Sequence, residues 1–351
     1  MAEYLGNAMS RGALGLGGVP QVERLSVRVV TDAYHHAFER SGSAGEVGIE
    51  RTSFALTPGK TPQTLRNEWG LALHVESARG KETRRILIDF GFTAETLNHN
   101  LKLLAIDCSA LDALVLSHGH YDHFGGMAGF LKAQRRRLKA RLPLYLGGEE
   151  CFCAREAGVG AAAGSFGALD RKAIAAAKLK VITTEKPVAI AGHAFSTGWI
   201  PAESFERVLS PTRMKVGMSG GVGCAAKKLP PEKREADMIP DDFQHEHATC
   251  FHVKDRGLVV ITSCGHRGVM NSVKQAMKVS GVTKVHAVLG GFHLAPHPPE
   301  YVAETVKALK QIAPDYVIPM HCTGEAFLAL AQQDMPGKVV RNSTGSRYTF
   351  G

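Results

Sequence analysis

The chain has 351 residues, of which 44% are hydrophobic and 21% are charged, and its formal net charge is +9. This composition excludes a fibrous or intrinsically disordered protein, and it supplies enough apolar surface for one large buried core or two smaller ones. The basic surplus is modest for this length. It favours an anionic small molecule as the partner and does not indicate a nucleic-acid-binding surface.

The N-terminal segment, residues 1–24, is interpreted as a mobile leader. Its Gly-rich stretch at residues 12–18 follows no predicted strand and opens no predicted helix, so it is not a nucleotide-binding loop. Residues 1–21 also lack the basic start and apolar core of an export signal, and no later segment is apolar over the length that a bilayer requires. We therefore expect a soluble, cytoplasmic protein with no membrane partner.

The seven cysteines are an odd number, scattered through a long chain without a CxxC pair. This pattern indicates reduced thiols and not a disulfide framework. The residues are Cys108, Cys151, Cys153, Cys224, Cys250, Cys264 and Cys322.

Strand and helix patterns alternate from residue 25 to residue 351, which we expect to form a single α/β (α+β) domain. In the first part, strands are predicted at 25–31, 71–76, 85–89, 112–116 and 143–146, with helices at 93–105 and 127–139. In the second part, strands are predicted at 180–183, 257–262, 284–289 and 316–318, with helices at 170–177, 268–279 and 299–312.

Two polar stretches are predicted to be irregular. Residues 32–62 follow the first strand and are interpreted as a long loop of the kind that often borders an active site. Residues 211–242 are polar and rich in Pro, Gly and Lys, which indicates a lid or loop insertion near residues 205–245.

A dense group of potential metal ligands directly follows the strand predicted at 112–116. The C-terminal end of a strand is where α/β sheets place their chemistry, and imidazole and carboxylate groups are suitable ligands for Zn²⁺, Fe²⁺ or Mn²⁺. Gathering such groups without a metal would be costly. A turn there can direct His118 and His120 to one metal ion, while Asp122 and His123 face a second.

The other ligands must come from elsewhere in the chain. His266 and His321 each lie in a Gly-containing loop directly after an apolar strand, and we predict that both are ligands. His293 lies in an equivalent loop, and the sequence leaves open whether it is a ligand, a substrate contact or an acid catalyst. His245 and His247 form an HxH pair in a polar loop, and we expect surface or core positions for them.

Four segments resemble the metallo-β-lactamase superfamily, and more narrowly its branch named for 7,8-dihydropterin-6-yl-methyl-4-(β-D-ribofuranosyl)aminobenzene 5′-phosphate synthase. They are residues 116–126 (LSHGHYDHFGG), 261–268 (ITSCGHRG), 290–294 (GGFHL) and 319–324 (PMHCTG). The first segment is specific for the superfamily, and the last two point to the branch. The resemblance implies an αββα four-layer sandwich whose metal site lies at one edge, between two sheets.

The resemblance also implies roles for individual residues. One metal ion would be bound by His118, His120 and His266, and the other by Asp122, His123 and His321. We expect two divalent ions, with zinc ahead of manganese or iron. The candidate catalytic residues are then Asp122 and His293, and the candidate substrate-binding residues are Asp32, Cys264, Phe292, His293 and Thr323.

One departure from the superfamily pattern concerns the group between the two metal ions. Dinuclear members usually have a further aspartate, often bridging the metals, just after a late strand. At the comparable strand end this chain has Cys264, Gly265 and His266. The identity of the bridging group is therefore open.

These features favour a metal-dependent hydrolase that acts on a small anionic substrate of phosphorylated, ester or pterin-like type. It would use a metal-activated water or a metal-stabilised leaving group. The alternatives are a transferase like the synthase of the same branch, a mononuclear iron oxidoreductase, and a non-catalytic metal-binding sensor. Homo-oligomer formation is compatible with the sequence.

Overall fold

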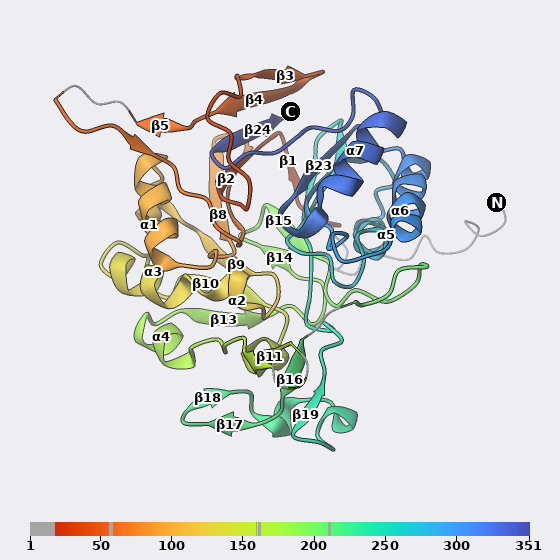
Figure 1. Ribbon diagram of the computed structural model, residues 1–351. Helices are drawn as coiled ribbons and strands as arrows, with labels where there is room; N and C mark the ends of the chain where they lie inside the picture. Colours follow the sequence, from red (N-terminus) through yellow and green to blue (C-terminus); the bar gives the residue numbers. More distant parts are fainter. Residues whose placement is uncertain (1–17, 56–58, 159, 161–162, 210–211) are drawn as a thin grey trace.

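The computed structural model describes residues 18–55, 59–158, 160, 163–209 and 212–351. Two large sheets face each other, and helices cover the outer side of each sheet (Figure 1). This arrangement is the αββα sandwich predicted from the sequence. Most of the predicted leader lies outside the described residues, but its end contributes β1 (Gln21–Val22), which pairs with β20 of the second sheet.

The first large sheet is built mainly from the N-terminal half of the chain. In spatial order its strands are β13 (Lys180–Thr183), β10 (Pro143–Leu146), β9 (Ala113–Leu116), β8 (Glu82–Ile88), β7 (Ala72–Arg79), β2 (Arg24–Thr31), β24 (Ser346–Phe350), β4 (Val47–Arg51) and β3 (Gly42–Ala44). The pairs β8–β9, β9–β10 and β10–β13 are parallel, so the C-terminal ends of these strands meet at one edge. The helices α1 (Ala94–Leu103), α3 (Met127–Gln134) and α4 (Arg171–Ala176) cover this sheet.

The second large sheet comes mainly from the C-terminal half. In spatial order its strands are β14 (Ala189–Ile190), β15 (Ala194–Ser196), β20 (Thr249–Val253), β21 (Gly257–Thr262), β22 (Val285–Gly291) and β23 (Tyr316–Met320). The last three strands are parallel. Its outer face carries α5 (Val269–Ser280), α6 (Pro299–Ile312) and α7 (Glu325–Asp334). Among the described helices, none combines the length and apolar character needed to cross a membrane.

The period-2 alternation of the strands explains how four layers are held together. Ile86 and Ile88 of β8 point into the apolar cluster between the two sheets, whereas Leu87 points into the cluster under α1 and α3. In β21, Val259 points into the central cluster and Val260 faces α5 and α6. Both sheets are therefore buried on both faces, which is why these strands have almost continuous apolar sequences.

The two stretches predicted as long loops contain short strands, so that prediction was wrong for parts of both. The first stretch includes β3, β4 and β5 (Phe54–Ala55), and β6 (Gln63–Thr64) lies just beyond it. The second includes β16 (Arg213–Lys215), β17 (Met218–Ser219), β18 (Val222–Gly223) and β19 (Met238–Pro240), with the short helices η4 (Ala226–Lys228) and η5 (Pro231–Lys233). A strand of two or three residues has too few side chains for its alternation to be read from sequence.

The segment from β16 to β19, which we call the insertion (residues 212–242), packs onto the rest of the domain through a small third sheet. Its strand order is β12 (Gly164–Ser165), β11 (Ala154–Ala157), β16 and β19. In Figure 1 this sheet lies at one end of the molecule, below β13 and α4.

The expectation that all cysteines are reduced is wrong for one pair, because Cys153 and Cys224 form a disulfide. The two residues are 71 positions apart, but the pairing of Ala154 with Lys215 between β11 and β16 brings their segments together. Such a contact depends on the register of a distant strand pair, which the cysteine spacing does not reveal. The other five cysteines are buried and free.

His247 connects the two large sheets next to the end of β9. Its backbone amide donates to the Ser117 carbonyl, and its Nε2 lies 3.1 Å from the Leu116 carbonyl. A carbonyl only accepts, so Nε2 carries the proton and Nδ1 accepts from the Ser196 hydroxyl at 3.2 Å. Burial lowers the pKa of His247 to about 4, and the ring is neutral near pH 7.

This buried neutral imidazole makes the free energy of unfolding depend on pH. An unfolded histidine binds its proton below about pH 6.5, and the folded one binds it only near pH 4, so between these values the unfolded state holds more protons. Stability is therefore complete above about pH 6.5 and falls as the pH drops, by about 3 kcal/mol near pH 4 from this residue. In denaturant titrations of metal-free protein, His247→Gln should lose less stability than wild type between about pH 7 and 4.5. Equal losses in the two proteins would contradict this account.

Candidate metal centre

The candidate site lies at the edge of the sandwich where parallel strands of both large sheets end. His118 follows β9 in the first sheet, and α2 (Tyr121–Phe124) places Asp122 and His123 one turn further on. From the second sheet, His266 follows β21 and His321 begins the short helix η6 (His321–Thr323) after β23. The short loops after these strands bring residues as far apart in the sequence as His118 and His321 to one place.

Two groups of three side chains meet there. In each group the potential ligand atoms all lie within 4.8 Å of one another. The first triad is His118, His120 and His266, and the second triad is Asp122, His123 and His321. The structure thus brings together the two ligand sets that the resemblance implies. The ring centroids of His118 and His123, one from each triad, are 4.2 Å apart.

Hydrogen bonds decide which ring nitrogens face the centre. The Ser117 hydroxyl donates to Asp89 at 2.7 Å, so it accepts from His118 Nδ1 at 2.9 Å and leaves Nε2 as a bare lone pair. Asp89 likewise accepts from His123 Nδ1 at 2.8 Å. Within the described part of the chain, Nε2 of His118, Nε2 of His123 and both nitrogens of His266 have no hydrogen-bond partner.

These orphaned nitrogens are the test of whether metal ions fit the site. A buried polar atom without a partner costs about 1–3 kcal/mol, and several lone pairs directed at one small volume are what a divalent cation would satisfy. Burial and the neighbouring imidazoles hold the pKa of His118 and of His266 well below the usual range. Burial lowers the pKa of His120 to about 3. All three rings are therefore neutral, which is the form that binds metal.

The second triad favours a positive charge. Burial opposes ionisation of Asp122, but His123 and His321 hold the pKa of its carboxyl below the ordinary value. Burial likewise opposes protonation of His321, yet Cys322 and Asp122 raise its pKa to about 9. His321 Nε2 lies 3.2 Å from Asp122 Oδ2. A cation bound here would take the place of the proton.

Asp89 is a residue of the site that sequence analysis did not single out. It is fully buried at the end of β8, and it accepts hydrogen bonds from the Ser117 amide, the Ser117 hydroxyl and His123 Nδ1, all at 2.7–2.8 Å. Its φ of 57° is uncommon for a residue other than glycine. The signal that the sequence offered was a carboxylate directly after the apolar end of β8, the strand that pairs with β9. Carboxylates behind a ligating imidazole fix its orientation and raise its basicity.

Replacing Asp89 should therefore weaken metal binding without removing a ligand. In Asp89→Ala, His123 loses its acceptor and Ser117 loses two bonds, and we expect metal affinity to fall about 10- to 100-fold. Competition with a chromophoric chelator measures this change. Asp107→Asn, at an exposed carboxylate, is the matched control. Wild-type affinity in Asp89→Ala would show that this carboxylate does not position His123.

A buried arginine holds the insertion against the HxH segment. Arg155 Nε donates to Asp241 at 2.6 Å, and its Nη2 donates to His245 Nε2 at 2.9 Å. The Gly119 amide donates to the same nitrogen at 3.1 Å, so His245 carries its proton on Nδ1, facing Glu150 at 3.4 Å. The His245 lone pair is thus used, and this residue belongs to neither triad. Gly119 must be glycine because the Arg155 guanidinium occupies the place of a Cβ.

The first residue of the insertion and the residue directly after its last one also touch the first triad. Thr212 Oγ1 lies 3.0 Å from His120 Nε2, which leaves Nδ1 of that ring to face the centre. The Phe243 ring, just after the insertion, stacks on His266 with centroids 3.8 Å apart and an interplanar angle of 15°. These contacts fix the orientation of two candidate ligand rings, and neither contact partner was predicted from the sequence.

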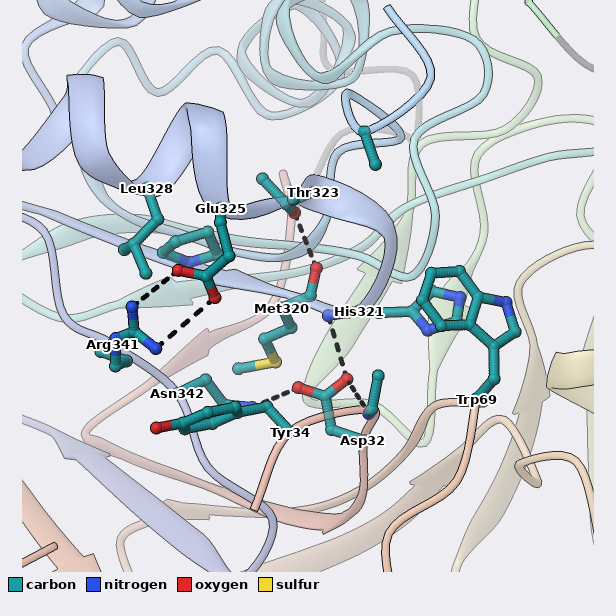
Figure 2. A pocket seen from close by; sticks show the side chains of 14 residues that line it. Asp32, Tyr34, Trp69, Met320, His321, Thr323, Glu325, Leu328, Arg341 and Asn342 are labelled. Carbon is teal, nitrogen blue, oxygen red and sulfur yellow. Dashed lines mark hydrogen bonds and ion pairs between the residues drawn. The ribbon is translucent and has the colours of Figure 1, made fainter. Parts of the chain in front are cut away.

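A cavity of about 280 Å³ opens beside the second triad (Figure 2). His321 forms part of its wall, with Asp32 and Thr323 from the predicted substrate-binding set. The aromatic rings of Tyr34 and Trp69 also line it. A molecule bound in this cavity would contact the second triad at the His321 side chain, which lines the cavity.

Asp32 fixes the backbone of His321, a member of the second triad. One carboxylate oxygen accepts from the amides of Ala33 at 2.7 Å and His321 at 2.9 Å, and the other accepts from Asn342 Nδ2 at 2.6 Å (Figure 2). His321 has a φ of 51°, and the bond from its amide stabilises this left-handed conformation. Burial raises the pKa of Asp32.

The other predicted substrate-binding residues lie outside this cavity. The Phe292 side chain is in the hydrophobic core, edge-on to Phe327 of α7 at 5.4 Å, because the strand end turns it away from the site. The Cys264 sulfur lies between the triads, since it groups with His118 of the first and His123 of the second, whereas His293 is on the side of the first triad. The His293 ring lies 4.0 Å from that of His266, and its Nε2 donates to the Leu209 carbonyl at 3.0 Å.

Comparisons with known proteins agree with this geometry. A family model described as the metallo-beta-lactamase superfamily matches residues 78–137, which include the first four predicted ligands. The Methanocaldococcus jannaschii protein named 7,8-dihydropterin-6-methyl-4-(beta-D-ribofuranosyl)-aminobenzene-5'-phosphate synthase is 28% identical over 261 residues, covering 74% of this chain and 82% of its own. Uncharacterized protein MJ0448 of the same organism is 28% identical over 250 residues, covering 71% and 83%.

Among solved structures, Tm1679 is described as a metal-dependent hydrolase of the beta-lactamase superfamily. It aligns with a TM-score of 0.65 and 20% identity, over 92% of this chain and 98% of its own. The chain thus has the metallo-β-lactamase fold, and its residues 78–137 match the model of the metallo-beta-lactamase superfamily. Over most of its length it is similar to the M. jannaschii synthase, as its sequence motifs predict.

Proposed function

We propose that this protein is a metal-dependent enzyme that hydrolyses a small phosphorylated or otherwise anionic substrate. The observation that carries the proposal is the pair of buried triads, with unpartnered ring nitrogens, next to a cavity of about 280 Å³. Imidazole and carboxylate ligands suit zinc, with manganese or iron(II) as alternatives. Two such ions would lower the pKa of coordinated water toward about 7 and polarise a phosphoryl or carbonyl oxygen.

The proposed roles of the chain's own groups follow from their contacts. Asp122 Oδ1 has no hydrogen-bond partner among the described residues, so this oxygen can orient a water molecule or accept its proton. His293 is the proposed proton donor to the leaving group. In the structure the His293 Nε2–H group donates a hydrogen bond to the Leu209 carbonyl. This hydrogen bond must break before His293 can donate to a substrate.

The cavity suggests how an anionic substrate is held. The Arg341 guanidinium lies over the Tyr34 ring at 5.1 Å and pairs with Glu325 at 2.7 Å. The Glu325 side chain is 74% exposed, so a substrate anion can take its place on the arginine at little cost. Trp69, which is 53% exposed, offers an aromatic face to the rest of the substrate.

A second candidate is transfer to an aromatic acceptor, favoured by the identity with the M. jannaschii synthase over most of both chains. In that reaction an aryl carbon or nitrogen would displace diphosphate from a pterin methylene. The two triads would then serve to stabilise the leaving diphosphate. The same cavity residues would bind the substrate in both cases.

Metal content tests the centre directly. Protein purified without chelator should contain about two zinc or manganese ions per chain, and His266→Ala and His321→Ala should each lose about one. His99→Ala, at a half-buried histidine that belongs to neither triad, is the control. A single iron, or full metal content in both variants, would contradict the dinuclear centre and direct attention to oxygen chemistry or a sensor role.

Turnover assays with the metal-loaded protein separate the two reactions. Phosphate esters and lactones test hydrolysis. A dihydropterin methyl diphosphate, supplied with and without a ribofuranosylaminobenzene phosphate, tests transfer. A pterin product that forms only with the amine present would identify a transferase, and absence of turnover with both metal positions filled would identify a non-catalytic protein.

Arg341→Ala should raise the KM for an anionic substrate about tenfold and leave kcat almost unchanged, because the charge-assisted bond is lost in ground state and transition state alike. Steady-state kinetics with an anionic substrate and an uncharged ester analogue measure the effect. The KM for the uncharged analogue should not change. An equal increase for both would mean that Arg341 shapes the cavity and does not bind the anion.

A further inference from the structure

Cys264 is a third kind of ligand group at the centre, and neither triad includes it. Its sulfur and one ring nitrogen each of His118 and His123 lie within 4.8 Å of one another. His118 belongs to the first triad and His123 to the second. The sulfur is therefore close to both metal positions at once.

Two glycines in the surrounding loops bring the Cys264 thiol close to the candidate ligands. Cys264 is buried in the loop after β21, two residues before His266, and Gly265 makes the turn between them with a φ of 74°. On the other side, Gly291 lets the loops after β21 and β23 approach, since a Cβ there would lie 3.0 Å from Cys322 Sγ and 3.1 Å from the Cys264 backbone. This is the strand end at which the sequence offers no bridging aspartate.

We propose that the Cys264 thiolate is a ligand shared by the two metal positions, in place of a bridging carboxylate. The proposal rests on the metal centre described above and adds a negative charge to it. An imidazole supplies no negative charge, so Asp122 is otherwise the single anionic member of the two triads. A second anion would offset more of the charge of two divalent cations. A thiolate ligand also selects zinc or iron over magnesium or manganese.

The neighbouring thiol has a different place. Cys322 Sγ lies 3.1 Å from Cys264 Sγ, and it groups with Cys264 and His293 but with no member of the two triads. Cys322 can donate a hydrogen bond to the sulfur or to the carbonyl of Cys264, the latter at 3.4 Å. It is thus a positioning residue, and it provides a matched control for a sulfur ligand.

Cobalt(II) reconstitution of the whole chain under anaerobic, reducing conditions tests the assignment without any activity assay. A thiolate bound to cobalt gives a near-ultraviolet charge-transfer band. Wild type and Cys322→Ser should show the band, whereas Cys264→Ser and Cys264→Asp should lack it. Cys264→Asp, which restores a carboxylate, should keep about two ions per chain, and Cys264→Ser should bind the weaker ion at least about tenfold less tightly.

Controls keep a folding defect apart from a lost ligand. Circular dichroism should show wild-type folding for Cys264→Asp, and Cys108→Ser removes a buried thiol elsewhere. Wild type with two bound cobalt ions and no sulfur band would overturn the proposal while leaving the metal centre intact. Loss of the band in Cys322→Ser with retention in Cys264→Ser would also overturn it. Failure of wild type to bind two ions would remove the centre and this proposal together.

Discussion

Imidazole rings from five histidines are buried together at one edge of the sandwich, and each must present an unprotonated nitrogen to the same small volume. Proton-bearing nitrogens must therefore be turned outward and satisfied there. Ser117 and Asp89 do this for His118 and His123, and Thr212 faces the outer nitrogen of His120. The surrounding polar residues are explained by this requirement more than by any direct contact with a substrate.

The same requirement accounts for unusual backbone conformations around the centre. Asp89, Phe243, His293 and His321 all have φ values of 46–57°, in the left-handed region. Each such conformation costs of order 1–3 kcal/mol for a residue other than glycine, and it persists only where the surroundings hold it. Here the holding contacts are visible, such as the Asp32 carboxylate on the His321 amide. Local strain is thus located where side chains must converge from separate strands.

Much of the fold could be predicted because most long elements have clear periodicity and clear ends. The strands β10, β13 and β21 and the helix α6 have the predicted bounds, and the triads follow from histidines at successive strand ends. What could not be predicted depends on contacts between distant segments. The short strands of the insertion, the Cys153–Cys224 disulfide and the Arg155–Asp241 pair are of this kind. Phe292 shows the limit within a recognised motif, since a residue one position from His293 can face the core.

The insertion is fastened to the domain at two points along its length. The disulfide ties Cys224 to the start of β11, and the fully buried pair of Asp241 with Arg155 ties its other end. Thr212 and Phe243 lie against rings of the first triad: Thr212 against His120, and Phe243 against His266. Swinging this segment open would require breaking a covalent bond, extracting a buried ion pair and unstacking a histidine. The insertion is therefore a fixed wall on the side of the first triad, and the cavity between Trp69 and Arg341 lies on the other side, against the second triad.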